Sequence, residues 1–65
     1  MTETEYNTRI DALITQRDAL WARYDATVAA HGVWSQEADT ALIAASNAED
    51  AVQTTAREFL RELER

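Results

Sequence analysis

The most regularly spaced chemical groups in this chain are the carboxylates of Asp11, Asp18 and Asp25. Because they recur every seven residues, they would line one strip of a helix, about 10.5 Å apart along its axis. Such a strip could dock a basic partner, or form part of a surface that imitates a nucleic acid. It could equally be a solvated face that keeps the protein in solution. The spacing leaves these interpretations open.

Metal or nucleophilic chemistry has few residues to draw on. His31 is the single histidine and cysteine is absent, so a transition metal would lack its preferred nitrogen and sulfur ligands. A carboxylate di-metal site in a helical bundle would need a Glu-x-x-His pattern, which does not occur. No glycine-rich phosphate loop and no Ser-His-Asp arrangement is recognisable. We therefore expect no catalytic residues, no metal site and no cofactor.

One ion pair is predicted between distant parts of the chain. Arg17 and Glu49 are the only charges in the middle of two otherwise apolar stripes. If the stripes run antiparallel with these two residues opposed, Trp21 faces Ala45, and the residue numbers in each facing pair add up to 66. The pair could set this register from a buried position, or it could be a site that a partner binds. It could also lie partly exposed at the seam, with the arginine stem packed and its head in water.

A helix over about residues 3–30 would position the first stripe. Its apolar residues recur with a period near 3.6 rather than two, which predicts a helix and argues against a strand. Thr2 and Glu5 have the spacing of a capping box at its start. The larger apolar residues of this helix fall at positions 6, 10, 13, 14, 20, 21, 24 and 28.

A turn over residues 31–35 would end this helix. Gly32, the only glycine, stands where a helix ending requires a positive φ, which glycine adopts without a steric penalty. We expect a Schellman ending, in which Val33 contacts Val28. Ser35 then caps the amino end of a second helix.

The second helix is predicted over about residues 36–64 and carries an alanine-rich stripe. Steps of four and three residues between its members are typical of a coiled coil, and the alanines allow the helices to approach closely. The expected fold is all-α, an antiparallel two-helix hairpin in which residues 1–65 form a single domain. The stripe comprises Ala38, Leu42, Ala45, Glu49, Val52, Ala56, Phe59 and Leu63.

Some apolar residues are left over by this pairing. Leu13 and Leu20 flank the first stripe, and Leu60 flanks the second. Trp34 lies in the turn, where it either folds over the end of the hairpin or stands exposed as a binding anchor. A chain this short buries only about 60% of its unfolded surface, and it has no disulfide. A second copy would cover the leucines, so we expect a homodimer in the form of a four-helix bundle.

The charge balance narrows the possible partners. Twelve acidic residues against six arginines and no lysine give a net charge of -6, which argues against direct binding to nucleic acid or to an anionic membrane. No apolar run is long enough to span a bilayer, and the polar segment at residues 1–5 does not have the pattern of a secretory signal. We expect a location in the cytoplasm of a bacterium or of a phage-infected cell.

By exclusion, the sequence favours a small acidic non-enzymatic helical protein that self-associates and binds a protein target. A phage-type or bacterial accessory, regulatory or inhibitor protein fits this description. One alternative is an acidic nucleic-acid mimic that blocks a nucleic-acid-binding protein, as some anti-defence proteins do. Another is a purely structural assembly component.

Overall fold

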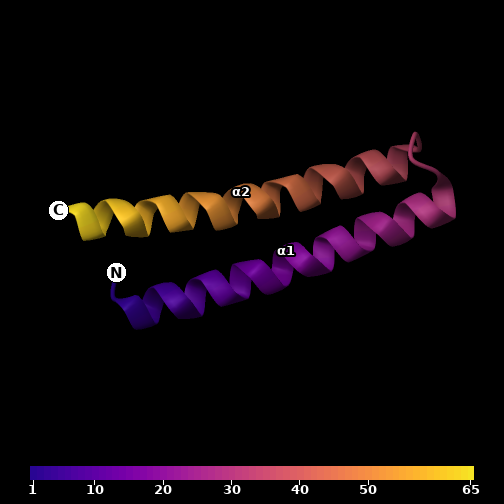
Figure 1. Cartoon of the computed structure of the whole chain (residues 1–65). Coiled ribbons are helices and arrows are strands. Elements are labelled where there is room, and N and C mark those ends of the chain that lie inside the picture. Colours follow the sequence, from indigo (N-terminus) through magenta and orange to yellow (C-terminus); the bar gives the residue numbers. More distant parts are fainter.

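Two long antiparallel helices joined by a short turn make up the protein, with both termini at the end opposite the turn (Figure 1). Helix α1 spans Glu3–His31 and helix α2 spans Gln36–Glu64. The structure is a computed structural model that describes residues 1–65. The predicted all-α hairpin is confirmed. Helix α1 continues one residue further than expected, because His31 is still helical.

The amino ends of both helices are capped by hydroxyl side chains. Thr2 Oγ1 accepts a hydrogen bond from the backbone N–H of Glu5 at 3.1 Å, and Ser35 Oγ accepts one from the N–H of Ala38 at the same distance. These bonds satisfy backbone donors that have no partner within a helix. The capping box at Thr2 differs from expectation in one respect. The carboxylate of Glu5 accepts from the Thr2 hydroxyl at 3.3 Å rather than from the Thr2 backbone.

The turn is built around Gly32, whose φ of 94° lies in the region that favours glycine. Its N–H donates to the carbonyl of Val28 at 2.8 Å, which is the single bond of the simpler helix ending. The predicted Schellman ending is wrong, because the ψ of 153° at Gly32 leads the chain away from the helix and Val33 lies half exposed. The carbonyl of Gly32 instead accepts from both the N–H and the hydroxyl of Ser35, at 3.2 and 2.7 Å.

Large side chains of α1 pack on alanines of α2 to form the core. All six alanines of α1 are exposed, whereas all seven of α2 are buried or half-buried. Ala38 and Ala45 are the least exposed residues of the chain, at 1% and 0%, followed by Thr55 at 8%. Small residues on one helix let the two backbones come close, so bulky residues of the other helix can cover them. The half-buried residues of α1 are Tyr6, Ile10, Leu13, Ile14, Arg17, Leu20, Trp21, Tyr24, Thr27 and Val28.

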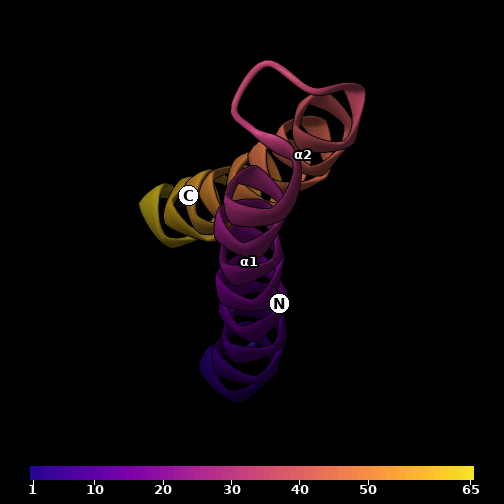
Figure 2. The same cartoon turned by 90° about the vertical axis from the view of Figure 1, so that its right-hand side faces the viewer.

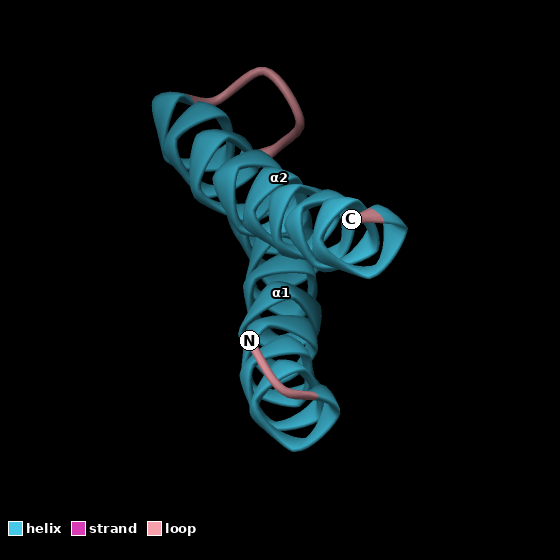
Figure 3. Ribbon diagram, turned by 90° about the vertical axis from the view of Figure 1, so that its left-hand side faces the viewer, coloured by secondary structure: helices cyan, strands magenta, loops and turns pink.

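Two contacts establish the register of the helices. Near the middle of the hairpin, Arg17 Nε lies 3.3 Å from Glu49 Oε2. Near its open end, the rings of Tyr6 and Phe59 stack with their centroids 4.1 Å apart. The residue numbers add up to 66 in the first pair and to 65 in the second, so the predicted antiparallel register is confirmed. The helices cross at an angle rather than running strictly parallel (Figures 2 and 3).

Two leucines predicted in the stripe of α2 lie on the surface instead. Leu42 is 37% exposed, because α2 presents its alanine side to α1 and leaves this leucine at the edge of the seam. Leu63 is 66% exposed, because it lies level with Glu3, where α1 begins and little of that helix remains to cover it. Thr55, which was not expected in the seam, is buried on the alanine side of α2.

Candidate interaction surfaces

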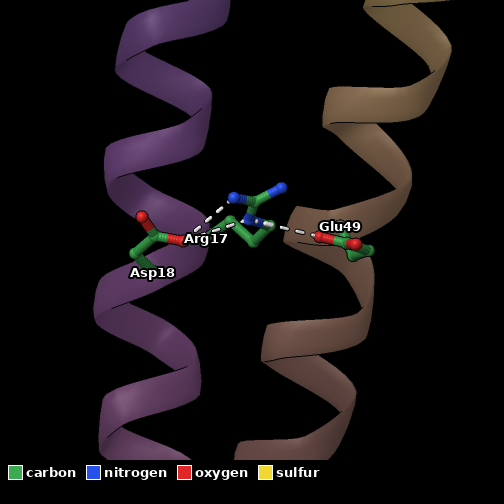
Figure 4. Close-up of polar contacts among 3 residues, drawn as sticks. All are labelled: Arg17, Asp18 and Glu49. Carbon is green, nitrogen blue, oxygen red and sulfur yellow. Dashed lines mark hydrogen bonds and ion pairs between the residues drawn. The ribbon is translucent and has the colours of Figure 1, made fainter.

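A small polar cluster occupies the middle of the hairpin (Figure 4). The guanidinium of Arg17 donates from Nε and Nη2 to Asp18 Oδ1, at 3.2 and 3.1 Å. On its other side, Nε lies 3.3 Å from Glu49 Oε2 across the seam. The arginine therefore links an outward carboxylate on its own helix to a carboxylate on α2.

The pair of Arg17 and Glu49 is partly exposed rather than fully buried. Their side chains keep 27% and 39% of their surface in contact with solvent. Glu49 Oε2 is itself buried and receives no aligned hydrogen bond, because the N–H groups of Arg17 point at Asp18. The contact across the seam is thus electrostatic, and exposed pairs of this kind contribute only about 0–1 kcal/mol. Its main effect is on register, because sliding either helix would separate the two charges.

The three aspartates of the predicted acidic strip all lie exposed on α1. Their charges are not equivalent, because Asp18 is held by Arg17 whereas Asp11 and Asp25 make no ion pair. The negative potential of the strip is therefore reduced at its centre. Sequence spacing alone could not reveal this, since neighbouring residues on a helix do not normally face each other.

A groove of about 500 Å³ runs between the helices near the turn. Its apolar lining comes from Leu20, Ala41 and Ala44. Charged and polar side chains surround them, among them Arg23 on α1 and Glu37 on α2. The groove is shallow and open. Its shape suits contact with side chains of another macromolecule better than enclosure of a small ligand.

The apolar lining of the groove continues along the hairpin. Residues seven apart share one side of a helix, so Leu13 lies in the same row as Leu20, and Ala51 in the same row as Ala44. All of these residues are half-buried. We call this surface the open side of the hairpin. It consists of Leu13, Leu20 and Thr27 on α1 and Ala41, Ala44, Ala48 and Ala51 on α2.

The predicted interface residues are found in three different settings. Leu13 and Leu20 are partly covered within the hairpin and line its open side. Leu60 is 56% exposed at the edge of α2. Trp34 is 96% exposed, so it does not fold over the end of the hairpin. Of the two interpretations for this tryptophan, the exposed position is the one observed.

Further findings concern metal sites, membrane-spanning segments and similarity to known proteins. No group of three or more His, Cys, Asp or Glu side chains is arranged to hold a metal ion. Neither helix combines the length and the apolar character needed to cross a membrane. Searches of protein-family models, curated proteins and solved structures find no match for this chain.

Proposed function

We propose that this chain is a small non-enzymatic interaction protein, which self-associates through its helices and binds a protein target through its turn. The observation that carries the proposal is the distribution of apolar side chains. The side of α2 that packs on α1 is mostly alanine, whereas several large apolar residues remain on the surface. The exposed ones are Val33, Trp34, Leu42, Ile43, Leu60 and Leu63, with Met1 at the threshold.

Incomplete burial supports self-association into a four-helix bundle. Only 3 of the 65 residues are buried, and the chain exposes 4869 Å². A compact monomer of 7.3 kDa would expose about 4,200 Å². The excess is surface that a second hairpin can cover, and stacked antiparallel hairpins form a common bundle.

The turn supports a second contact, with a different protein. Trp34 projects almost entirely into solvent beside the half-exposed Val33. Tryptophan combines a large apolar area with a hydrogen-bond donor and is enriched among the residues that dominate protein interfaces. Because the turn lies at the tip of the hairpin, it stays accessible when the helix faces are covered by a second copy.

The acidic-mimic alternative has weaker support. A nucleic-acid mimic needs closely spaced free carboxylates, but Arg17 engages Asp18 at the centre of the strip. Arg9 and Arg23 add exposed positive charge on the same helix. The purely structural alternative would leave the exposed Trp34 without a role.

Affinity capture with the full chain and two variants tests the proposal. Trp34→Ala should lose the captured protein, whereas Thr54→Ala, an exposed substitution on α2, should retain it. Capture at raised salt separates the alternatives, because binding by a mimic weakens steeply with salt and apolar docking does not. Equal capture by both variants would contradict the role of the turn. A chain that stays monomeric in sedimentation velocity at high micromolar concentration would contradict self-association.

A further inference from the structure

The open side carries large side chains on α1 and small ones on α2, so two copies of this surface can fit together. Its α1 row carries the half-buried Leu13 and Leu20, which are large, and its α2 rows carry half-buried alanines, which are small and line a groove. Within the chain, large residues of α1 already pack on alanines of α2. Large residues can pack on alanines in the same way between two copies, if α1 of each copy lies over α2 of the other.

We infer that the open side is the interface with a second copy, related to the first by a two-fold axis running along the hairpin. This inference rests on the proposed self-association and specifies its geometry. Both turns then lie at the same end of the dimer, and every helix is antiparallel to its two neighbours. The interface is isologous, since one surface meets itself.

The two-fold axis also sets the register between copies. A rotation about the long axis leaves position along that axis unchanged, so facing residues follow the same numbering rule as within the hairpin. Leu20 of one copy is then level with the space between Ala44 and Ala48 of the second copy. Knobs of this kind between small residues are the packing units of helical bundles.

Leu13 repeats this pattern one heptad away, where it is level with the region beside Ala51 of the second copy. By symmetry, each of these contacts is made twice. The open side therefore contributes four leucines to the centre of the bundle, each opposite small residues. This arrangement fills the groove near the turn and its continuation along the hairpin.

The charges at the rim agree with this arrangement. Arg9 and Arg23 flank the leucine row, and Glu37 and Glu58 flank the alanine rows. All four are exposed, and none makes an ion pair within the hairpin. In the proposed dimer, Arg9 is level with Glu58 of the second copy, and Arg23 lies about 9 Å along the bundle axis from Glu37 of the second copy. Complementary charges of this kind favour one orientation over others.

The opposite orientation fits poorly. A two-fold axis across the hairpin would place α1 on α1 and α2 on α2, with the turns at opposite ends. Leucine would then meet leucine, alanine would meet alanine and leave gaps, and Glu37 would approach Glu58 of the second copy. Voids and like charges both cost stability.

The available area is sufficient for a stable dimer. The hairpin measures 47 by 16 Å between Cα positions on its broad side, which is roughly 750 Å². A standard stable interface buries about 800 Å² on each partner. The broad side of the hairpin, on which the open side lies, therefore has about the area that a dimer of this size requires.

Distances between spin labels test the geometry. The chain has no cysteine, so a single introduced cysteine carries the only label. In a Trp34→Cys variant, the two labels should lie well under half of the 47 Å hairpin length apart. Turns at opposite ends would instead give a distance comparable to that length. A label at Thr15→Cys, near the middle of α1, should give a short distance in either dimer and serves as the control.

Charge reversal provides a second test, read by sedimentation velocity. Arg9→Glu should weaken dimerisation by about tenfold, since an exposed charge contact is weak but is made twice. Arg61→Glu changes the net charge equally, on the far side of α2, and should have an effect of less than about threefold. Adding Glu58→Arg to Arg9→Glu should recover most of the loss. A dimer with distant turns would overturn the inferred geometry and leave self-association standing, whereas a monomer in every assay would overturn both.

Discussion

Replacing Ala45 with leucine tests the central feature of the fold, the alanine seam of α2. Ala45 has no exposed surface, and it lies beside the large side chains of α1. Leucine adds three carbon atoms where the helices have no space for them. Overpacking of this kind costs about 1–3 kcal/mol. For a chain of this size, each kcal/mol lowers the melting temperature by about 4–8 °C, so we expect a decrease of roughly 5–20 °C.

Ala22→Leu is the matched control for this experiment. Ala22 is exposed on α1, the chemical change is identical, and the helix propensities of alanine and leucine are similar. We expect a change in unfolding free energy below about 0.5 kcal/mol. Thermal melts followed by circular dichroism, at one protein concentration, measure both variants. Equal shifts for Ala45→Leu and Ala22→Leu would show that α2 does not present its alanines to α1, and the reasoning would fail.

Three further substitutions probe the turn and the register. Ser35→Ala should cost about 1 kcal/mol in thermal unfolding, because it removes the cap of α2. Gly32→Ala should cost about 1–2 kcal/mol from backbone strain alone, since no atom lies within 4 Å of an added Cβ; an unchanged melt would contradict the positive φ. A double-mutant cycle between Arg17 and Glu49 should give a coupling below about 1 kcal/mol that weakens with salt.

The local features of the hairpin could be predicted from the sequence. Helix starts depend on residues within one turn of each other, so Thr2 and Ser35 were recognisable as caps without knowledge of the fold. Gly32 marked the only place where a positive φ is easily adopted. The register followed from two charges, Arg17 and Glu49, because each stood alone in its stripe.

Tertiary packing alone decided which residues of α2 lie at the edge of the seam. Leucines and alanines are both apolar, so the periodicity of α2 marks a wide arc without saying which part of it is covered. The helices approach closely where large side chains of α1 meet small residues of α2, and this packing buries Ala45 and Thr55 while leaving Leu42 at the edge. Leu63 is exposed for a different reason, because the length of α1 determines where cover ends.

The sequence therefore determined the two helices, their caps and their alignment, because these depend on neighbouring residues or on isolated charges. The tertiary structure determined which surfaces remain open, because exposure depends on how closely two helices can approach. It also decided that Arg17 holds Asp18 as well as Glu49, since side-chain direction follows from packing. The open side and the projecting Trp34 are consequences of that packing.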